Sequence, residues 1–80
     1  MQIKFKDLAQ IETFIKLVEQ YTGDVMVHGG TYDRDGESLM GLLSLGCGKW
    51  LDLTLTEEDS VDAFEFKKAV KQIGIKTKGV

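Results

Sequence analysis

The spacing of apolar residues divides the chain into strand-like and helix-like segments. Alternation of apolar with polar residues predicts a strand that buries one face. It occurs in residues 2–6 and 49–55. Residues 25–28 have one face that is more apolar than the other, and residues 32–37 can return as their partner strand after the turn signal Gly29-Gly30. Apolar residues spaced by three and four positions predict helices with one buried stripe. They occur between residues 7 and 23, within 38–46 and between residues 56 and 74.

These segments follow one another as strand, helix, two strands, helix, strand, helix. That order predicts an α+β fold, an open two-layer sandwich in which three helices cover one face of a four-stranded antiparallel sheet. Eighty residues are enough for one domain and too few for two. We expect a single domain at residues 1–75, followed by a loose C-terminal tail at residues 76–80.

Capping residues mark the ends of the first two helices. Asp7 stands where a helix cap belongs, and Gln10 follows three residues later to complete a capping box. Gly23 is expected to close that helix. Ser38 can cap the free amide groups of the second helix, and Gly46 can take the left-handed conformation that ends it.

Composition narrows the classes of function. The formal charge of −3 is spread over mixed acidic and basic residues, which argues against a nucleic-acid-binding surface. No apolar run reaches the roughly 18 residues of a membrane span. The single cysteine, Cys47, cannot form an internal disulfide and fits a reducing cytoplasm. Acidic residues 57–59 are consecutive and cannot converge on one ion, so we expect neither a metal nor a cofactor.

Residues 38–46, Ser-Leu-Met-Gly-Leu-Leu-Ser-Leu-Gly, resemble the Ser-Ile-Met-Gly-x-x-Ser-Leu-Gly segment of HPr, the histidine phosphocarrier of the bacterial sugar phosphotransferase system. The spacing back to Asp24 and forward to the last helix also suits that family. The resemblance covers about residues 7–74 and implies the HPr-like form of the predicted sandwich.

The same resemblance assigns roles to the second helix. It implies that Leu39, Met40 and Leu43 form an apolar docking surface for protein partners, such as phosphotransferase-system proteins or transcriptional regulators. This helix also carries more apolar residues than one sheet can bury, and dimerisation through the same patch is the neighbouring possibility. Ser38 matches the serine that a dedicated kinase phosphorylates in some members of the family. The alternative is that Ser38 serves only as the helix cap.

The histidine motif of the family, Gly-Ile-His-Ala-Arg-Pro-Ala, has no counterpart here. Alignment places Asp7 to Gln10 over its histidine, alanine, arginine and proline, and the chain contains no proline. Asp7 and the only histidine, His28, are the remaining candidate phosphoacceptors. A capping role for Asp7 and a half-exposed side chain for His28 are the simpler interpretations.

The sequence therefore favours an HPr-like protein without the active-site histidine. We expect a cytoplasmic regulatory or protein-interaction module and not an enzyme. Two alternatives remain open: a phosphocarrier that uses His28 or Asp7, and a small accessory or oligomeric subunit that uses the apolar helix as a permanent interface.

Overall fold

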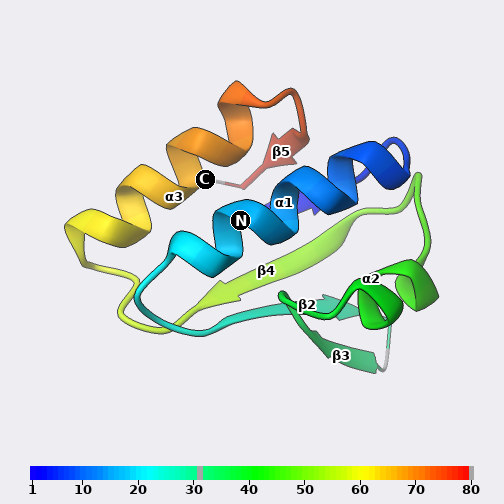
Figure 1. The fold of residues 1–80 in the computed structure, drawn as a ribbon, viewed down its shortest axis with the longest axis horizontal. Coiled ribbons are helices and arrows are strands. Elements are labelled where there is room, and N and C mark those ends of the chain that lie inside the picture. The colour runs from blue at the N-terminus through cyan, green and yellow to red at the C-terminus, as the bar shows by residue number, and fades with distance from the viewer. Residues whose placement is uncertain (31, 80) are drawn as a thin grey trace.

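A computed structural model describes residues 1–30 and 32–79. Within them, five strands form one sheet in the order β3-β2-β4-β1-β5. The elements, in chain order, are β1 (Gln2–Lys4), α1 (Leu8–Gln20), β2 (Val25–Gly29), β3 (Tyr32–Asp35), α2 (Leu39–Leu45), β4 (Leu51–Leu55), α3 (Val61–Gln72) and β5 (Lys76–Lys78). Figure 1 shows the three helices on one side of the sheet, which leaves the other face open. The predicted two-layer α+β arrangement is confirmed.

All strand pairs in the sheet are antiparallel. The central strand β4 shows why the sequence folds this way, because its leucines at 51, 53 and 55 are buried while Asp52 and Thr54 are exposed. This alternation directs one face of the strand to the helices and the other to solvent. Charged β3 lies at one edge, as expected for a strand of low propensity.

The sequence predicted four strands and a loose tail at residues 76–80, whereas the structure has a fifth strand within that tail. Residues 76–78 form β5, which pairs with β1 at the edge of the sheet. Lys-Thr-Lys has no apolar alternation, so its pattern gave no sign of a strand. Ile75 is buried and holds the chain beside β1, whose backbone groups then gain hydrogen-bond partners.

A single apolar core fills the space between the sheet and the helices. Phe14 lies at its centre and makes edge-to-face contacts with Phe5 and Phe66, at ring-centroid distances of 5.2 and 5.9 Å. Aromatic pairs favour this geometry. The ring of Phe14 thus connects α1 with α3 and with the residue that follows β1, and it fixes how the two long helices lie on the sheet.

The helix ends follow the predicted caps with one exception. The carboxylate of Asp7 accepts a hydrogen bond from the backbone N–H of Gln10 at 3.0 Å. Gly46 ends α2 with a φ of 87°. Gly23, however, does not close α1, because the helix ends at Gln20 with Tyr21 in extended conformation as its cap. In the described part of the chain, none of the helices combines the length and the apolar character that a membrane span requires.

Candidate docking site on α2

Helix α2 divides its apolar residues between the core and the solvent. Leu42 and Leu45, three positions apart, are buried against the sheet. On the other side, Leu39, Met40 and Leu43 expose 40%, 77% and 41% of their surface. These three residues, called the α2 patch below, are spaced by one and three positions and therefore share one side of the helix. Sequence reasoning predicted this set, and the structure places it at the surface.

Ser38 lies at the N-terminal end of the α2 patch. Its hydroxyl oxygen accepts a hydrogen bond from the backbone N–H of Gly41 at 3.0 Å, which is the expected cap. Just before it, the Asp35 carboxylate accepts a hydrogen bond from the N–H of Glu37 at 2.9 Å. Both acidic side chains are exposed, so the border of the patch at this end is negatively charged.

Gly41 allows β3 and α2 to approach closely. A Cβ atom at this position would lie 3.0 Å from the Ser38 hydroxyl oxygen and 3.2 Å from Cδ of Arg34. The Arg34 guanidinium in turn donates from Nε to the Ser44 hydroxyl at 3.2 Å. The glycine within the Ser-Leu-Met-Gly motif thus has a packing role, because it leaves room for the arginine that ties α2 to the edge strand.

The beginning of α1 adjoins this site. Helices α1 and α2 pack against each other, and the N–H of Gly48, just after α2, donates to the carbonyl of Phe5 at 2.8 Å. Figure 1 shows the N-terminal end of α1 and the C-terminal end of α2 at the same end of the molecule. Leu8, at the first position of α1, is 47% exposed there. Exposed apolar side chains are therefore present at the start of α1 as well as on α2.

The two candidate phosphoacceptors lie on different elements of the fold. Asp7 is exposed and occupied as the cap of α1. His28 lies on β2, where its Nδ1 contacts the carboxylate of Asp33 and its Nε2 lies 3.0 Å from the hydroxyl of Thr54. Asp52 is its direct partner on β4. The structure therefore places the only histidine on the open face of the sheet, between two carboxylates and away from the helix N-termini.

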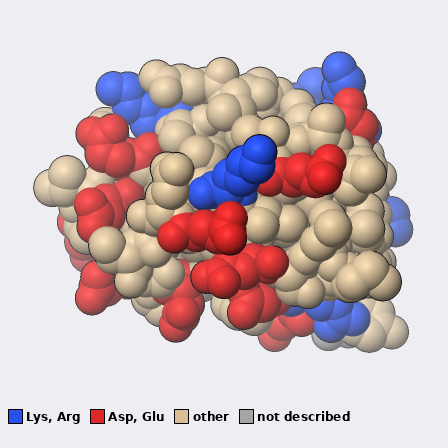
Figure 2. All heavy atoms as spheres, in the orientation of Figure 1, with Lys and Arg blue, Asp and Glu red and all other residues tan. Residues whose placement is uncertain are grey.

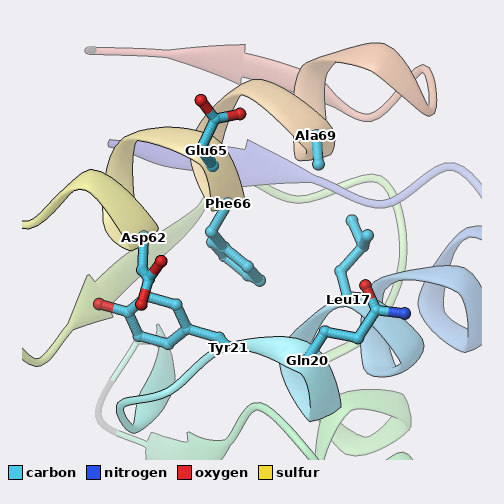
Figure 3. Close-up of a pocket in the computed structure, with 7 residues that line it drawn as sticks. All are labelled: Leu17, Gln20, Tyr21, Asp62, Glu65, Phe66 and Ala69. Carbon is cyan, nitrogen blue, oxygen red and sulfur yellow. The ribbon is translucent and has the colours of Figure 1, made fainter.

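A groove between α1 and α3 was missed by the sequence analysis. Its volume is about 290 Å³, and Figure 3 shows the side chains that line it, which come from both helices: Leu17, Gln20, Tyr21, Asp62, Glu65, Phe66 and Ala69. One of its two carboxylates is already engaged, because the hydroxyl of Thr22 donates to Asp62 at 2.9 Å. No local sequence signal identifies this groove, since its two walls are separated by more than half of the chain.

Acidic side chains gather around the first turn of α3. Figure 2 shows them toward the left, where α3 begins in Figure 1. Glu58 forms an ion pair with Lys67 at 3.2 Å. Among residues 1–30 and 32–79, no group of three or more histidine, cysteine or acidic side chains is arranged to hold a metal ion.

Comparison with known proteins places the fold. No protein-family model matches the chain, and no curated protein matches it either. Among solved structures, it is similar to Crh, the catabolite repression protein of Bacillus subtilis, described at 1.8 Å as an intertwined dimer with a swapping domain. The TM-score is 0.64 and the identity 23%, over 88% of this chain and 84% of Crh. The chain therefore has the HPr-like fold that residues 38–46 predicted, with a fifth strand at the edge of its sheet.

Proposed function

We propose that this chain is a non-enzymatic regulatory module of the HPr type, which acts by docking onto a protein partner and not by carrying phosphoryl groups. The observation that supports the proposal best is the exposure of the α2 patch. Leu39, Met40 and Leu43 lie together at the surface, on a helix held in place by Leu42 and Leu45 underneath. Contiguous exposed apolar side chains of this kind are typical of protein interaction sites.

The surroundings of the candidate phosphoacceptors argue against group transfer. A phosphorylated histidine at position 28 would bring its negative charge beside Asp33 and Asp52, which repel it. The carboxylate of Asp7 is used as the cap of α1. Recognition is the activity that remains for a domain with this fold and this surface.

The α2 patch and its border indicate the chemistry of the partner. An apolar centre requires an apolar pocket on the other protein. The exposed Asp35 and Glu37 at one end of the patch favour a pocket with a basic rim. We infer that the partner is a transcriptional regulator or a phosphotransferase-system protein, and the structural likeness to a catabolite repression protein favours the regulator.

Isothermal titration of the chain into a purified catabolite-repression regulator tests this proposal. Met40→Asp should weaken binding by about 30-fold or more, because it places a charge in a desolvated contact. Val61→Asp is the matched control, since Val61 is also apolar and 75% exposed but lies on α3. The proposal fails if the wild-type chain does not bind such a regulator, or if both variants weaken binding equally.

Regulation at Ser38 is a separate part of the proposal. A phosphate there would lie at the N-terminus of α2, next to the α2 patch, and would add negative charge to the border formed by Asp35 and Glu37. Incubation with an HPr kinase and ATP should then add one phosphate, which the Ser38→Ala variant should not accept. The absence of any mass change in the wild-type chain would remove this switch and leave the docking proposal intact.

An oligomeric role is the second candidate, and the intertwined dimer of Crh favours it. Size-exclusion chromatography with light scattering separates the two uses of the helix. A dimer that becomes a monomer in Met40→Asp would show that a second copy occupies the α2 patch. If the wild-type chain is a monomer, the α2 patch remains available to a different protein.

A further inference from the structure

Lysine side chains gather at one corner of the open sheet face, where β1 pairs with β5. Lys4 and Lys76 are direct cross-strand partners, and Gln2 is the partner of Lys78. Directly paired residues project from the same face of a sheet. The ammonium nitrogens of Lys4 and Lys78 lie 4.7 and 4.3 Å from the ring centroid of Trp50, which places this ring in the same cluster.

A pocket opens beside this cluster. Its volume is about 260 Å³, and it is lined by Lys4, Phe5, Lys6, Gln10, Gly48, Gly74 and Lys76. Three of these seven residues are lysines and none is acidic. In the described part of the chain, the ion pairs are His28–Asp33 and Lys67–Glu58, so the lysines at 4, 6, 76 and 78 are without a carboxylate partner. These four residues are called the lysine corner below.

The lysine corner places two like charges opposite each other on neighbouring strands. Like charges directly opposite each other on neighbouring strands destabilise a sheet, and Lys4 and Lys76 stand in that relation. An anion between their ammonium groups would convert the repulsion into attraction. A phosphate group suits the position because its several oxygens accept charge-assisted hydrogen bonds from more than one lysine.

The charges on the rest of the sheet limit the size of the anion. The row of paired residues that begins at Lys78 continues through Gln2 to Asp52, His28 and Asp33. The positive region therefore ends within two strands of the edge. A long polyanion such as a nucleic acid would meet these carboxylates, whereas a small anion would not.

We propose that the lysine corner binds a small phosphate monoester, whose phosphate lies between Lys4, Lys6 and Lys76 in the 260 Å³ pocket. This inference does not rest on docking through α2, because no residue of the α2 patch lines the pocket. It assigns a use to β5, the strand that brings Lys76 opposite Lys4.

The fluorescence of Trp50 can report binding, because Trp50 is the only tryptophan of the chain and its ring contacts Lys4 and Lys78. Its fluorescence is followed during titration with glucose 6-phosphate, AMP or inorganic phosphate at constant ionic strength. We expect saturable binding of at least one monoester, more tightly than inorganic phosphate. The amide shifts of the isotopically labelled protein should change along β1, β5 and around Gly48.

Two variants with the same charge change test the location. Lys76→Gln should weaken binding by about tenfold, because it removes one charge-assisted contact. Lys16→Gln, on the exposed side of α1, should leave the midpoint unchanged. Equal weakening by both variants would indicate non-specific attraction and overturn the proposal. So would inorganic phosphate binding as tightly as the esters, or no fluorescence and no amide-shift response up to about 10 mM ester.

Discussion

The hydroxyl oxygen of Ser38 accepts a hydrogen bond from the backbone N–H of Gly41 at 3.0 Å and so closes the first turn of α2. The cap satisfies one of the amide groups that the first turn of this seven-residue helix leaves free. The oxygen atom that stabilises the helix is also the one that a kinase would modify. The stability of α2 and the phosphorylation proposed above therefore involve the same side chain.

Replacement of Ser38 by alanine should lower the free energy of unfolding by about 1 kcal/mol, because one capping hydrogen bond is lost. In a domain of this size, the thermal midpoint should fall by about 4–8 °C. Circular dichroism melting curves measure both. Ser38→Asp keeps a cap acceptor and should melt close to the wild-type chain, so an equal loss in both variants would contradict the capping role.

Leu42 and Met40 lie two positions apart on α2, and replacing each by alanine should change the stability of the domain by very different amounts. Leu42 is fully buried, so Leu42→Ala should cost about 2–5 kcal/mol through lost burial and the cavity that remains. Met40 is largely exposed, so Met40→Ala should stay within about 0.5 kcal/mol of the wild-type chain. Urea unfolding measures the difference. Comparable losses in the two variants would mean that α2 turns a different side toward the sheet.

Deletion of residues 76–80 should destabilise the domain without unfolding it. The deletion removes the pairing of β5 with β1 and leaves the edge of β1 without its partner. We expect a loss of about 1–3 kcal/mol, from a few backbone hydrogen bonds of modest net value. Amide exchange of Gln2 and Lys4 should become faster, while exchange in β4 stays slow. Unchanged stability and exchange would mean that β5 contributes nothing to the edge.

Phosphoenolpyruvate and the general phosphotransferase enzyme should leave the chain unphosphorylated, because the N-terminus of α1 presents Asp7 where a carrier needs an imidazole. Mass spectrometry of the intact chain detects transfer to His28 under alkaline conditions, which preserve phosphohistidine, and transfer to Asp7 near neutral pH, because an aspartyl phosphate hydrolyses in alkali. Phosphate on the wild-type chain that disappears in His28→Gln would establish the phosphocarrier alternative. Phosphate that disappears in Asp7→Asn would show that the chain is a phosphocarrier that uses Asp7.

The local pattern of apolar, polar and capping residues was sufficient to predict most of the fold. The leucines of β4 alternate strictly, and Asp7 and Ser38 stand directly before apolar runs, so the elements and their caps could be predicted without tertiary information. The resemblance of residues 38–46 to the HPr segment also indicated how these elements are arranged in space. The α2 patch was predicted for a simple reason, because a short helix with five large apolar residues cannot bury all of them on one sheet.

The remaining features depend on residues that are distant in the sequence. The three residues of β5 have no strand pattern, and they become a strand because Ile75 is buried and β1 offers an unpaired edge. Gly23 looked like a helix end, yet α1 stops earlier. The hydroxyl of Tyr21, its cap residue, donates to the carbonyl of Thr56. That contact can form only when the C-terminal ends of α1 and β4 lie close together.

The amino-acid sequence by itself determined the helices, four of the strands, the N-terminal caps of α1 and α2 and the absence of a histidine at the start of the first helix, because each of these depends on residues within a few positions of one another. Tertiary structure alone decided that Lys4 faces Lys76, that His28 lies between carboxylates, and that α1 and α3 enclose a groove. Those relationships join segments up to about seventy residues apart, and only the burial of a shared core fixes how such segments align.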